Sequence, residues 1–330
     1  MRILVTGSAG HLGEALMRSL RGTQHEPSGL DIKPSPFTDH AGSVSDRAFV
    51  CECLRGIDAV VHTATLHKPH IATHSRQNFV DTNITGTLNL LEESVRAGVG
   101  SFIYTSTTSV FGRALIPPAG APTAWITEDV TPEPRNIYGV TKLSAETLCE
   151  LFHRSTGLPC LVLRTARFFP EDDDDRRARQ RFDSDNLKVN EYLYRRADLE
   201  DVVSAHLLAI DKAPALGFDR LIISATTPFT RADLPALRTD APEVVRRLFP
   251  QYAAEYSRRG WSMVPGIDRV YANDRARLQM GWQPRYDFAG ALRRLTANED
   301  YRSALACEVG AKGYHSQAFA DGPYPVSDRT

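Results

Sequence analysis

The N-terminal sequence MRILVTGSAGHLG restricts the fold more than any other part of the chain. It opens with an apolar run, residues 2–6, which predicts a strand buried on both faces, as in a parallel sheet. Three glycines follow, at Gly7, Gly10 and Gly13, and a helical pattern comes next. Glycines where a strand turns into a helix permit a tight turn and let a pyrophosphate approach the backbone at the helix N-terminus. We therefore expect a dinucleotide-binding α/β fold.

Strand-like and helix-like segments alternate along the chain as far as about residue 225. We expect further strands at residues 58–64, 101–107, 159–166 and 220–225, and helices at residues 11–21, 76–98, 137–157 and 197–210. This alternation predicts a doubly wound parallel sheet. Residues 1–166 are interpreted as a Rossmann domain that binds the dinucleotide. Residues 167–330 are interpreted mainly as a substrate-binding region, with residues from about 197 to 225 returning to the sheet.

Two of the predicted helices carry signals at their ends. The helix at 76–98 ends at Gly98 and has, among its apolar positions, Val80, Leu88, Leu91 and Val95. The helix at 197–210 is expected to be capped by Asp198.

Composition and charge exclude several classes of partner. The 330 residues include 39 basic and 40 acidic ones, a net charge of -1, so no field of one sign favours nucleic acid or an anionic membrane. No run approaches the length of about 18 apolar residues that spans a bilayer. The strand expected at residue 2 leaves no room for a signal peptide. Five scattered cysteines fit a reduced, cytoplasmic compartment better than a disulfide framework.

The residue Asp31 points to the identity of the dinucleotide. It lies 18 residues after Gly13, in the sequence GLDIK. A carboxylate at this distance from the glycines accepts hydrogen bonds from the adenosine ribose and repels a 2′-phosphate. The spacing therefore favours NAD over NADP, although Lys33 is close enough to soften the preference.

The sequence YGVTK supplies a candidate acid–base pair, Tyr138 and Lys142. Residues four apart on a helix share a face. A phenol with its ordinary pKa of about 10 is a poor base at neutral pH. We expect the Lys142 ammonium to stabilise the phenolate, lower the pKa of Tyr138 and make the pair usable in proton transfer. Lys142 could also hold the nicotinamide ribose.

Taken together, several motifs resemble the extended short-chain dehydrogenase/reductases, also called the NAD-dependent epimerase/dehydratase family. The resemblance covers about residues 1–297 and rests on TGSAGHLG, VVHTAT, NITGTLNLLEES, TSTTSVFG, YGVTK, LRTARFF and RARLQMGWQPRYDFAGAL. It implies that Thr107 is a catalytic hydroxyl that acts with Tyr138 and Lys142. It also implies hydride exchange between a secondary carbinol and the nicotinamide.

The same resemblance implies further positions and an assembly. The residues expected to line the cofactor, besides the glycines, Asp31, Tyr138 and Lys142, are His11, Leu12, Ser43, Val44, Thr63, Ala64, Asn83 and Thr105. Helices 76–98 and 137–157 form a paired-helix dimer surface in this family, which implies a homodimer.

Three departures from the family pattern narrow the function. Thr108 and Ser109 stand where the sugar-nucleotide dehydratases of the family carry an Asp-Glu pair, so dehydration is not expected. Arg167 stands where the epimerases usually have an Asn. Only the 27 residues from 170 to 196 precede the next shared helix, where epimerases carry a long nucleotide-binding insertion. We expect a substrate smaller than a nucleotide sugar, either polyhydroxylated or anionic, bound by His67, Thr108 and Arg167.

The charged sequence PEDDDDRRARQRF, residues 170–182, is open to more than one interpretation. It is either a solvated loop whose charges pair with each other, or a lid or rim whose arginines bind the substrate. Arg167 is the better substrate ligand because it lies nearer the end of a strand, and guanidinium suits carboxylate or phosphate. A nucleic-acid arm is the least favoured, because five acids adjoin the arginines.

A histidine-rich loop and the C-terminal region complete the candidates. The spacing of His70 and His74 is one that zinc sites use. We favour a different interpretation, in which the loop passes over the cofactor and His67 contacts cofactor or substrate. No metal is predicted. In the C-terminal signature we expect packing rather than chemistry, with apolar anchors at Leu278, Met280, Trp282 and Phe288. The last 30 residues are interpreted as an irregular tail packed on the body.

Three functions are consistent with these features. The first is an NAD-dependent oxidoreductase acting on a secondary hydroxyl of a sugar or similar small polar molecule. The second is a sugar-nucleotide epimerase of the UDP-hexose 4-epimerase type, which would oxidise and re-reduce one carbon. The third is a non-catalytic, NAD-sensing regulator, against which the presence of Thr107, Tyr138 and Lys142 argues.

Overall fold

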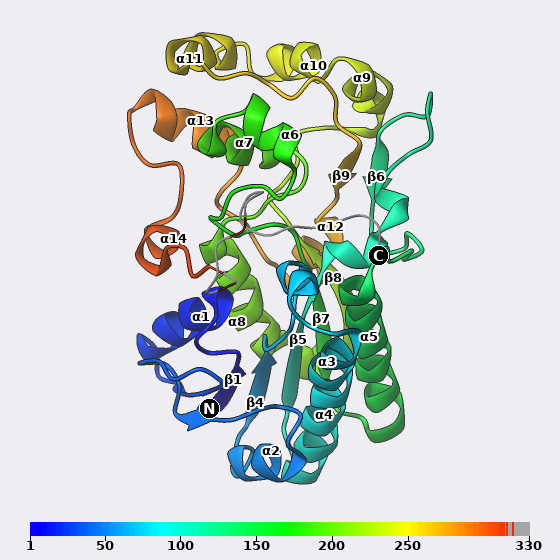
Figure 1. Cartoon of the computed structure of the whole chain (residues 1–330), viewed down its shortest axis with the longest axis vertical. Helices are drawn as coiled ribbons and strands as arrows, with labels where there is room; N and C mark the ends of the chain where they lie inside the picture. Colours follow the sequence, from blue (N-terminus) through cyan, green and yellow to red (C-terminus); the bar gives the residue numbers. More distant parts are fainter. Residues whose placement is uncertain (314, 316–318, 320–330) are drawn as a thin grey trace.

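A seven-stranded parallel sheet forms the centre of the molecule (Figure 1). The computed structural model describes residues 1–313, 315 and 319. The strand order is β3-β2-β1-β4-β5-β7-β8. The strands are β1 (Arg2–Thr6), β2 (Glu26–Asp31), β3 (His40–Ala41), β4 (Ala59–His62), β5 (Ser101–Thr107), β7 (Cys160–Thr165) and β8 (Phe218–Ile223). The order reverses between β1 and β4, and open sheets of this kind bind ligands beyond the carboxyl ends of the strands at such a reversal.

Helices cover both faces of this sheet, as the alternation predicted. On one face α1 (His11–Arg21) packs against α8 (Leu199–Leu216), and on the other α4 (Gly86–Ala97) packs between α2 (Arg47–Cys53) and α5 (Ile137–Thr156). Each face buries its own apolar cluster. The prediction of a doubly wound α/β fold is therefore confirmed. The expected cap is also present, because the Asp198 side chain accepts a hydrogen bond from the Glu200 N–H.

The helix predicted at 76–98 is present, but its middle is not α-helical. It consists of α3 (Arg76–Phe79), a π-helical turn (Val80–Thr85) and α4, and ends at the left-handed Gly98. A π turn holds more residues than an α turn, so it rotates the side chains that follow. The buried side of α4 is therefore formed by Leu90 and Leu91, whereas Val95, an expected apolar position, is 38% exposed.

A smaller layer lies above the carboxyl ends of the strands, at the top of Figure 1. It contains a second parallel sheet of two strands, β6 (Ala124–Ile126) and β9 (Arg269–Tyr271). Its helices are α6 (Arg176–Arg181), α7 (Ser184–Glu191), α9 (Leu234–Thr239), α10 (Ala241–Leu248), α11 (Tyr252–Arg259) and α13 (Phe288–Thr296). The layer has its own apolar cluster. The proposed division into residues 1–166 and 167–330 stays a prediction, and β8 is the last strand of the large sheet.

The C-terminal signature packs largely as expected. Met280, Trp282 and Phe288 are buried, but Leu278 is 81% exposed, so its prediction as an anchor is wrong. The reason is helical geometry. In α12 (Asp274–Met280) the buried residues are Ala276 and Met280, four apart on one face, and Leu278 lies on the opposite face. The helix α14 (Ala304–Val309) follows and packs on α1 and α8.

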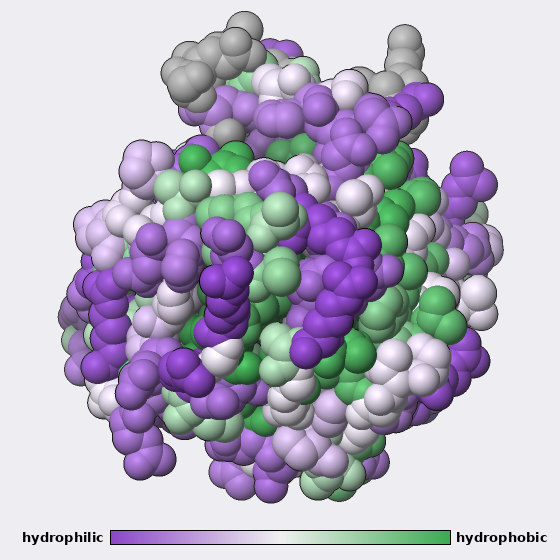
Figure 2. All heavy atoms as spheres, turned by 90° about the horizontal axis from the view of Figure 1, so that it is seen from below, coloured by the Kyte–Doolittle hydropathy of each residue, from purple (hydrophilic) through white to green (hydrophobic). Residues whose placement is uncertain are grey.

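The surface, the helices and the cysteines can be compared with what the composition predicts. On the face seen in Figure 2, hydrophilic residues are spread between apolar ones rather than gathered in one place. In the part of the chain that the structure describes, no helix is both long and apolar enough to cross a bilayer. All five cysteines are free thiols.

Candidate functional site

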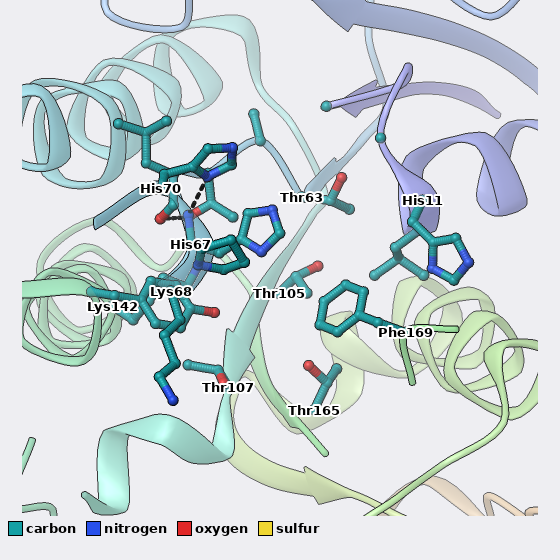
Figure 3. Close-up of a pocket in the computed structure, with 18 of the residues that line it drawn as sticks. His11, Thr63, His67, Lys68, His70, Thr105, Thr107, Lys142, Thr165 and Phe169 are labelled. Carbon is teal, nitrogen blue, oxygen red and sulfur yellow. Dashed lines mark hydrogen bonds between the residues drawn. The ribbon is translucent and has the colours of Figure 1, made fainter. Parts of the chain in front are cut away.

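One cavity of about 940 Å³ lies beyond the carboxyl ends of the strands, at the reversal of strand order. It brings together most of the residues predicted from the sequence, several of which Figure 3 labels. The predicted residues that line it are Gly7, Gly10, His11, Leu12, Gly13, Asp31, Ser43, Val44, Thr63, Ala64, His67, Thr105, Thr107, Thr108, Tyr138, Lys142 and Arg167. The candidate cofactor and catalytic residues thus share one chamber.

The glycine turn leaves no space for side chains. Gly7 has a φ of +73°, and a Cβ there would lie 2.7 Å from the Ala64 nitrogen. A Cβ on Gly13 would lie 1.9 Å from the Gly7 carbonyl oxygen. Each contact is too short for real atoms, so the backbone of β1, the turn and α1 can approach closely only because these residues are glycines. This cradle at the N-terminus of α1 fits the pyrophosphate of a dinucleotide.

The Asp31 carboxylate is held at the edge of the glycine turn. Its Oδ2 accepts a hydrogen bond from the Ala9 N–H at 3.0 Å, and its Oδ1 accepts one from the Lys33 N–H at 2.8 Å. Asp31 is the last residue of β2, and β2 pairs with β1. The carboxylate therefore lies where an adenosine ribose would meet it.

His11 is a buried polar residue whose hydrogen-bonding capacity is unused. Both ring nitrogens are buried without a partner among the described residues, and the ring stacks on Phe168 with centroids 5.9 Å apart. Burial lowers the pKa of His11 to about 4, so the imidazole is neutral at pH 7. An unpartnered donor and acceptor in the wall of the cavity are suited to a polar ligand, which is a second respect in which the cavity fits a dinucleotide.

Asn83 differs from its prediction, because it does not line the cavity. Its amide lies behind the loop that follows β4, where Oδ1 accepts from the Leu66 N–H at 2.8 Å and Nδ2 donates to the Leu66 carbonyl at 2.9 Å. Nδ2 also bonds the Thr141 hydroxyl at 3.0 Å, on the helix that carries the catalytic candidates. Asn83 therefore positions the cavity wall from behind. The π turn in which it lies gave no signal in the sequence.

The three catalytic candidates come from two elements. Thr107 is the last residue of β5, and Tyr138 and Lys142 lie on the first turns of α5. Burial raises the pKa of Tyr138 to about 12, and a hydrogen bond with the Thr107 side chain lowers it. The expected fall of the phenol pKa is therefore wrong for the protein without cofactor. At this buried position the loss of hydration outweighs the hydrogen bond with Thr107.

Burial shifts the pKa of Lys142 further than that of Tyr138. It is 2% exposed, and its ammonium lies 4.1 Å from the centre of the Tyr104 ring. Burial lowers its pKa to about 7, while the charge of Glu146, one turn further along α5, raises it. At neutral pH the amine thus exchanges its proton readily, which suits a group that assists proton transfer.

A buried ionic network supports α5 from beneath, and sequence reasoning missed it. Glu146 accepts a hydrogen bond from the Ser106 hydroxyl at 2.5 Å and pairs with Arg164 at 2.8 Å. Ser106 lies between Thr105 and Thr107 on β5, and its side chain points to the other face of the strand. The network therefore links the catalytic strand, the catalytic helix and β7.

The charged run is folded into the wall of the cavity and is not a free arm. Asp175 caps α6, and Asp173 is buried, where its Oδ2 accepts from Arg167 at 2.5 Å and from Arg195 at 3.2 Å. Lys68 and Asp174 form an ion pair between the loop after β4 and the run. The guanidinium of Arg167, the expected substrate ligand, is thus already engaged by acids of its own chain.

His62, at the end of β4, and the histidines of the loop that follows have structural partners. His62 bridges the Thr6 hydroxyl, 2.7 Å from Nδ1, and the Thr87 hydroxyl, 3.0 Å from Nε2. The His67 N–H donates to His70 Nδ1 at 3.0 Å, as Figure 3 shows, and the His67 ring stacks on Phe169. Among the described residues no group of histidine, cysteine or carboxylate side chains could hold a metal ion.

Lys312, Gly313 and His315 contact elements around the cofactor side of the cavity, which Lys312 and Gly313 line. Lys312 pairs with Glu14 on the first turn of α1, and the Gly313 N–H donates to Glu171 Oε1 at 3.2 Å. His315 Nε2 lies 3.0 Å from the Pro69 carbonyl, in the loop after β4. These three residues thus connect the glycine-turn helix, the charged run and the loop. Most of the tail beyond them lies outside the described residues.

Comparison with known proteins assigns the chain to a family. The model of the NAD dependent epimerase/dehydratase family matches residues 3–217, which include the glycine turn, β5 and the YGVTK helix. The chain belongs to this family. Membership confirms the predicted NAD dependence and the resemblance to the extended short-chain dehydrogenase/reductases.

Proteins similar to this chain are named for different reactions. The chain is 28% identical to a dTDP-glucose 4,6-dehydratase of Streptomyces antibioticus, over 89% of this chain and 91% of that protein. A short-chain dehydrogenase/reductase superfamily protein from Agrobacterium tumefaciens, solved with bound NAD, is 25% identical, with a TM-score of 0.64 over 93% of this chain and 99% of the other. The UDP-glucose 4-epimerase of Thermotoga maritima, solved with UDP-glucose, is 22% identical, with a TM-score of 0.62 over 90% of this chain and 98% of the other, a likeness in fold alone.

Proposed function

We propose that this family member is an NAD-dependent oxidoreductase that transfers a hydride between a secondary hydroxyl of a small polar substrate and the nicotinamide. The observation that carries the proposal is the shared chamber, in which Thr107, Tyr138 and Lys142 line the same cavity as the glycine turn and Asp31. A hydroxyl of a substrate bound there would be within reach of both a proton acceptor and a redox cofactor.

In the proposed mechanism each residue has one task. NAD, when bound, supplies the hydride acceptor and a positive charge in the nicotinamide ring. The Thr107 hydroxyl holds the substrate oxygen by a hydrogen bond, and Tyr138 removes the hydroxyl proton. Lys142, one helical turn away, lines the same cavity and would assist the proton transfer, because burial brings its pKa to about 7 and its amine exchanges a proton at neutral pH. Dehydration is not part of the proposal, because Thr108 and Ser109 follow Thr107 and neither is an acid.

A small substrate is favoured by the volume available. The cavity of about 940 Å³ must hold the dinucleotide as well as the substrate. Ligand pockets of about 300–1,000 Å³ are usual for single drug-sized molecules. The segment from 170 to 196 folds into two short helices and an ionic network beside the cavity, without a long nucleotide-binding insertion. Both observations favour a sugar or a hydroxy acid over a nucleotide sugar.

The second candidate is a sugar-nucleotide epimerase. The observation that favours it is the set of contacts made by Lys312, Gly313 and His315. Such contacts around the cofactor side would retain NAD through many turnovers, as an enzyme that regenerates its own cofactor requires. The purified protein should be denatured and the supernatant assayed for NAD(H). We expect clearly less than one NAD(H) per chain, together with reversible binding of added NAD and NADH formation with small sugars or hydroxy acids. Near-stoichiometric NAD(H) and no net NADH formation would support the epimerase.

The substitution Asp31→Asn tests how the cofactor is selected. The amide keeps the shape of the carboxylate and can still accept a hydrogen bond from the Ala9 N–H, but it no longer repels a 2′-phosphate. We expect the ratio of the Kd for NADP to the Kd for NAD to fall by at least about tenfold, because the loss of about 1.4 kcal/mol of discrimination corresponds to that factor. Titration with both cofactors measures it, and an unchanged ratio would contradict the assignment of Asp31.

A homodimer remains a proposal. The helices α4 and α5, which carry the expected dimer surface, expose three apolar side chains, Val95, Val140 and Leu151. These side chains are consistent with contact between two copies through this pair of helices.

A further inference from the structure

We propose that Arg269 anchors an anionic group of the substrate, a carboxylate or a phosphate monoester on a small polyhydroxylated molecule. The inference rests on the proposed function and deepens it, because it names the chemical class of the substrate. It concerns the upper wall of the cavity, which is formed by β9 and the chain around Arg195.

The first observation is the position of Arg269. It is the first residue of β9, which pairs with β6 in the small sheet above the carboxyl ends of the large one. Arg269 and Tyr271 are two apart on the strand, so their side chains leave the same face, and both line the cavity that contains Thr107 and Tyr138. The guanidinium therefore belongs to the chamber in which the reaction is proposed.

The second observation is that the Arg269 side chain has no partner. Its Nε is buried without a hydrogen bond, and its guanidinium makes no ion pair with any residue that the structure describes. The other cations of this wall are engaged, because Arg167 pairs with Asp173, Arg195 with Glu191, and Lys68 with Asp174. A buried hydrogen-bond donor without an acceptor costs about 1–3 kcal/mol of stability. A ligand oxygen that accepts from it would recover this free energy on binding.

The third observation is that a second arginine reinforces the charge. The Nε of Arg195 is also buried without a hydrogen bond, although its Nη2 lies 2.6 Å from Glu191. Burial raises the pKa of the Tyr194 phenol, while Arg195 and Arg269 both lower it, so the two guanidiniums lie near one ring. A planar guanidinium bonds two oxygens of a carboxylate or phosphate at once, which selects these groups over a neutral hydroxyl.

The size of the chamber restricts the anion. A dinucleotide bound at the glycine turn would fill a large part of the cavity of about 940 Å³, and Arg167 beside the charged run is engaged by Asp173. What remains suits a molecule such as a hexuronate or a sugar phosphate. A hexuronate and a sugar phosphate both carry an anionic group that a guanidinium can bind, and binding experiments with one compound of each kind distinguish them.

The test compares D-glucuronate, D-glucose 6-phosphate and neutral D-glucose as probes of the whole protein with NAD present. We expect one of the two anions to bind at least about tenfold more tightly than glucose, since a hydrogen bond to a charged group contributes about 1.5–3 kcal/mol. Arg269→Met should abolish this difference and leave both glucose binding and the Kd for NAD unchanged. Arg269→Lys should keep part of it, because the charge remains and the paired donors are lost.

A matched control is Arg231→Met. Arg231 lies over the Trp125 ring of the neighbouring strand β6 but does not line the cavity, so this substitution should leave all three affinities unchanged. Calorimetric binding and NADH formation are measured separately. If an anion binds through Arg269 without any turnover, the inference stands and the proposed function fails. Equal affinity for charged and neutral probes, or an anion preference that persists in Arg269→Met, overturns the inference.

Discussion

Tyr138→Phe should reduce turnover by about 10²- to 10⁴-fold, the range that a positioned acid–base group contributes. Phenylalanine keeps the ring in its buried place on α5 but removes the hydroxyl that bonds Thr107 and that takes the substrate proton in the proposed mechanism. The glycine turn and Asp31, which would hold the pyrophosphate and the adenosine ribose, are unchanged in the variant. We therefore expect the Kd for NAD to stay within about threefold of the wild-type value, a difference below 1 kcal/mol. Steady-state rates and cofactor titrations with the same preparation measure both quantities.

The control for this experiment is Tyr286→Phe. Tyr286 also donates its hydroxyl to a side chain, Glu200 at 3.0 Å, but lies outside the cavity. Its variant should retain full turnover. Turnover that survives in Tyr138→Phe would remove Tyr138 from the mechanism. NAD binding without any turnover in the wild-type protein would instead support the remaining alternative, a non-catalytic regulator that senses NAD.

The fold and much of the site were predictable because they depend on local patterns. The apolar runs of β1 and β4 identify strands buried on both faces, and the glycines identify the turn at the first of them. Tyr138 and Lys142 lie together because four residues separate them on one helix. Such features depend only on the sequence neighbours of each residue. In the structure the candidate cofactor and catalytic residues, apart from Asn83, lie in one cavity.

The remaining features depend on residues far apart in the chain. Arg167 looked suited to bind substrate, but Asp173 and Arg195 fold around it, and no local pattern announces that network. Arg269 was not singled out in the sequence, and its place in the cavity wall depends on the pairing of β9 with β6, far apart in the chain. The pKa of Tyr138 also differs from expectation, because burial is a property of the whole fold and sequence spacing supplies only the neighbouring charge.

Lys142→Met should abolish turnover and at the same time stabilise the cofactor-free protein. Burial lowers the pKa of Lys142 from 10.5 to about 7, and each unit of such a shift corresponds to about 1.4 kcal/mol. The gain at pH 7 is partly offset by loss of the contact between the ammonium and the Tyr104 ring, worth about 1–2 kcal/mol. Glu146 keeps its ion pair with Arg164 in the variant. We expect the free energy of unfolding to rise by about 3 kcal/mol at pH 7.

The dependence of this gain on pH separates a charge effect from better packing. Between pH 7 and 10.5 the unfolded chain holds a proton on Lys142 that the native protein has released, so this residue makes wild-type stability rise with pH in that window. The advantage of Lys142→Met should therefore shrink as the pH is raised from 7 and vanish near 10.5. Urea denaturation of both proteins across this range measures it, with Lys212→Met, at an exposed lysine on α8, as the control that should change stability by less than about 0.5 kcal/mol. A gain that is the same at every pH would mean that methionine merely packs better. The buried ammonium would then not destabilise the folded protein.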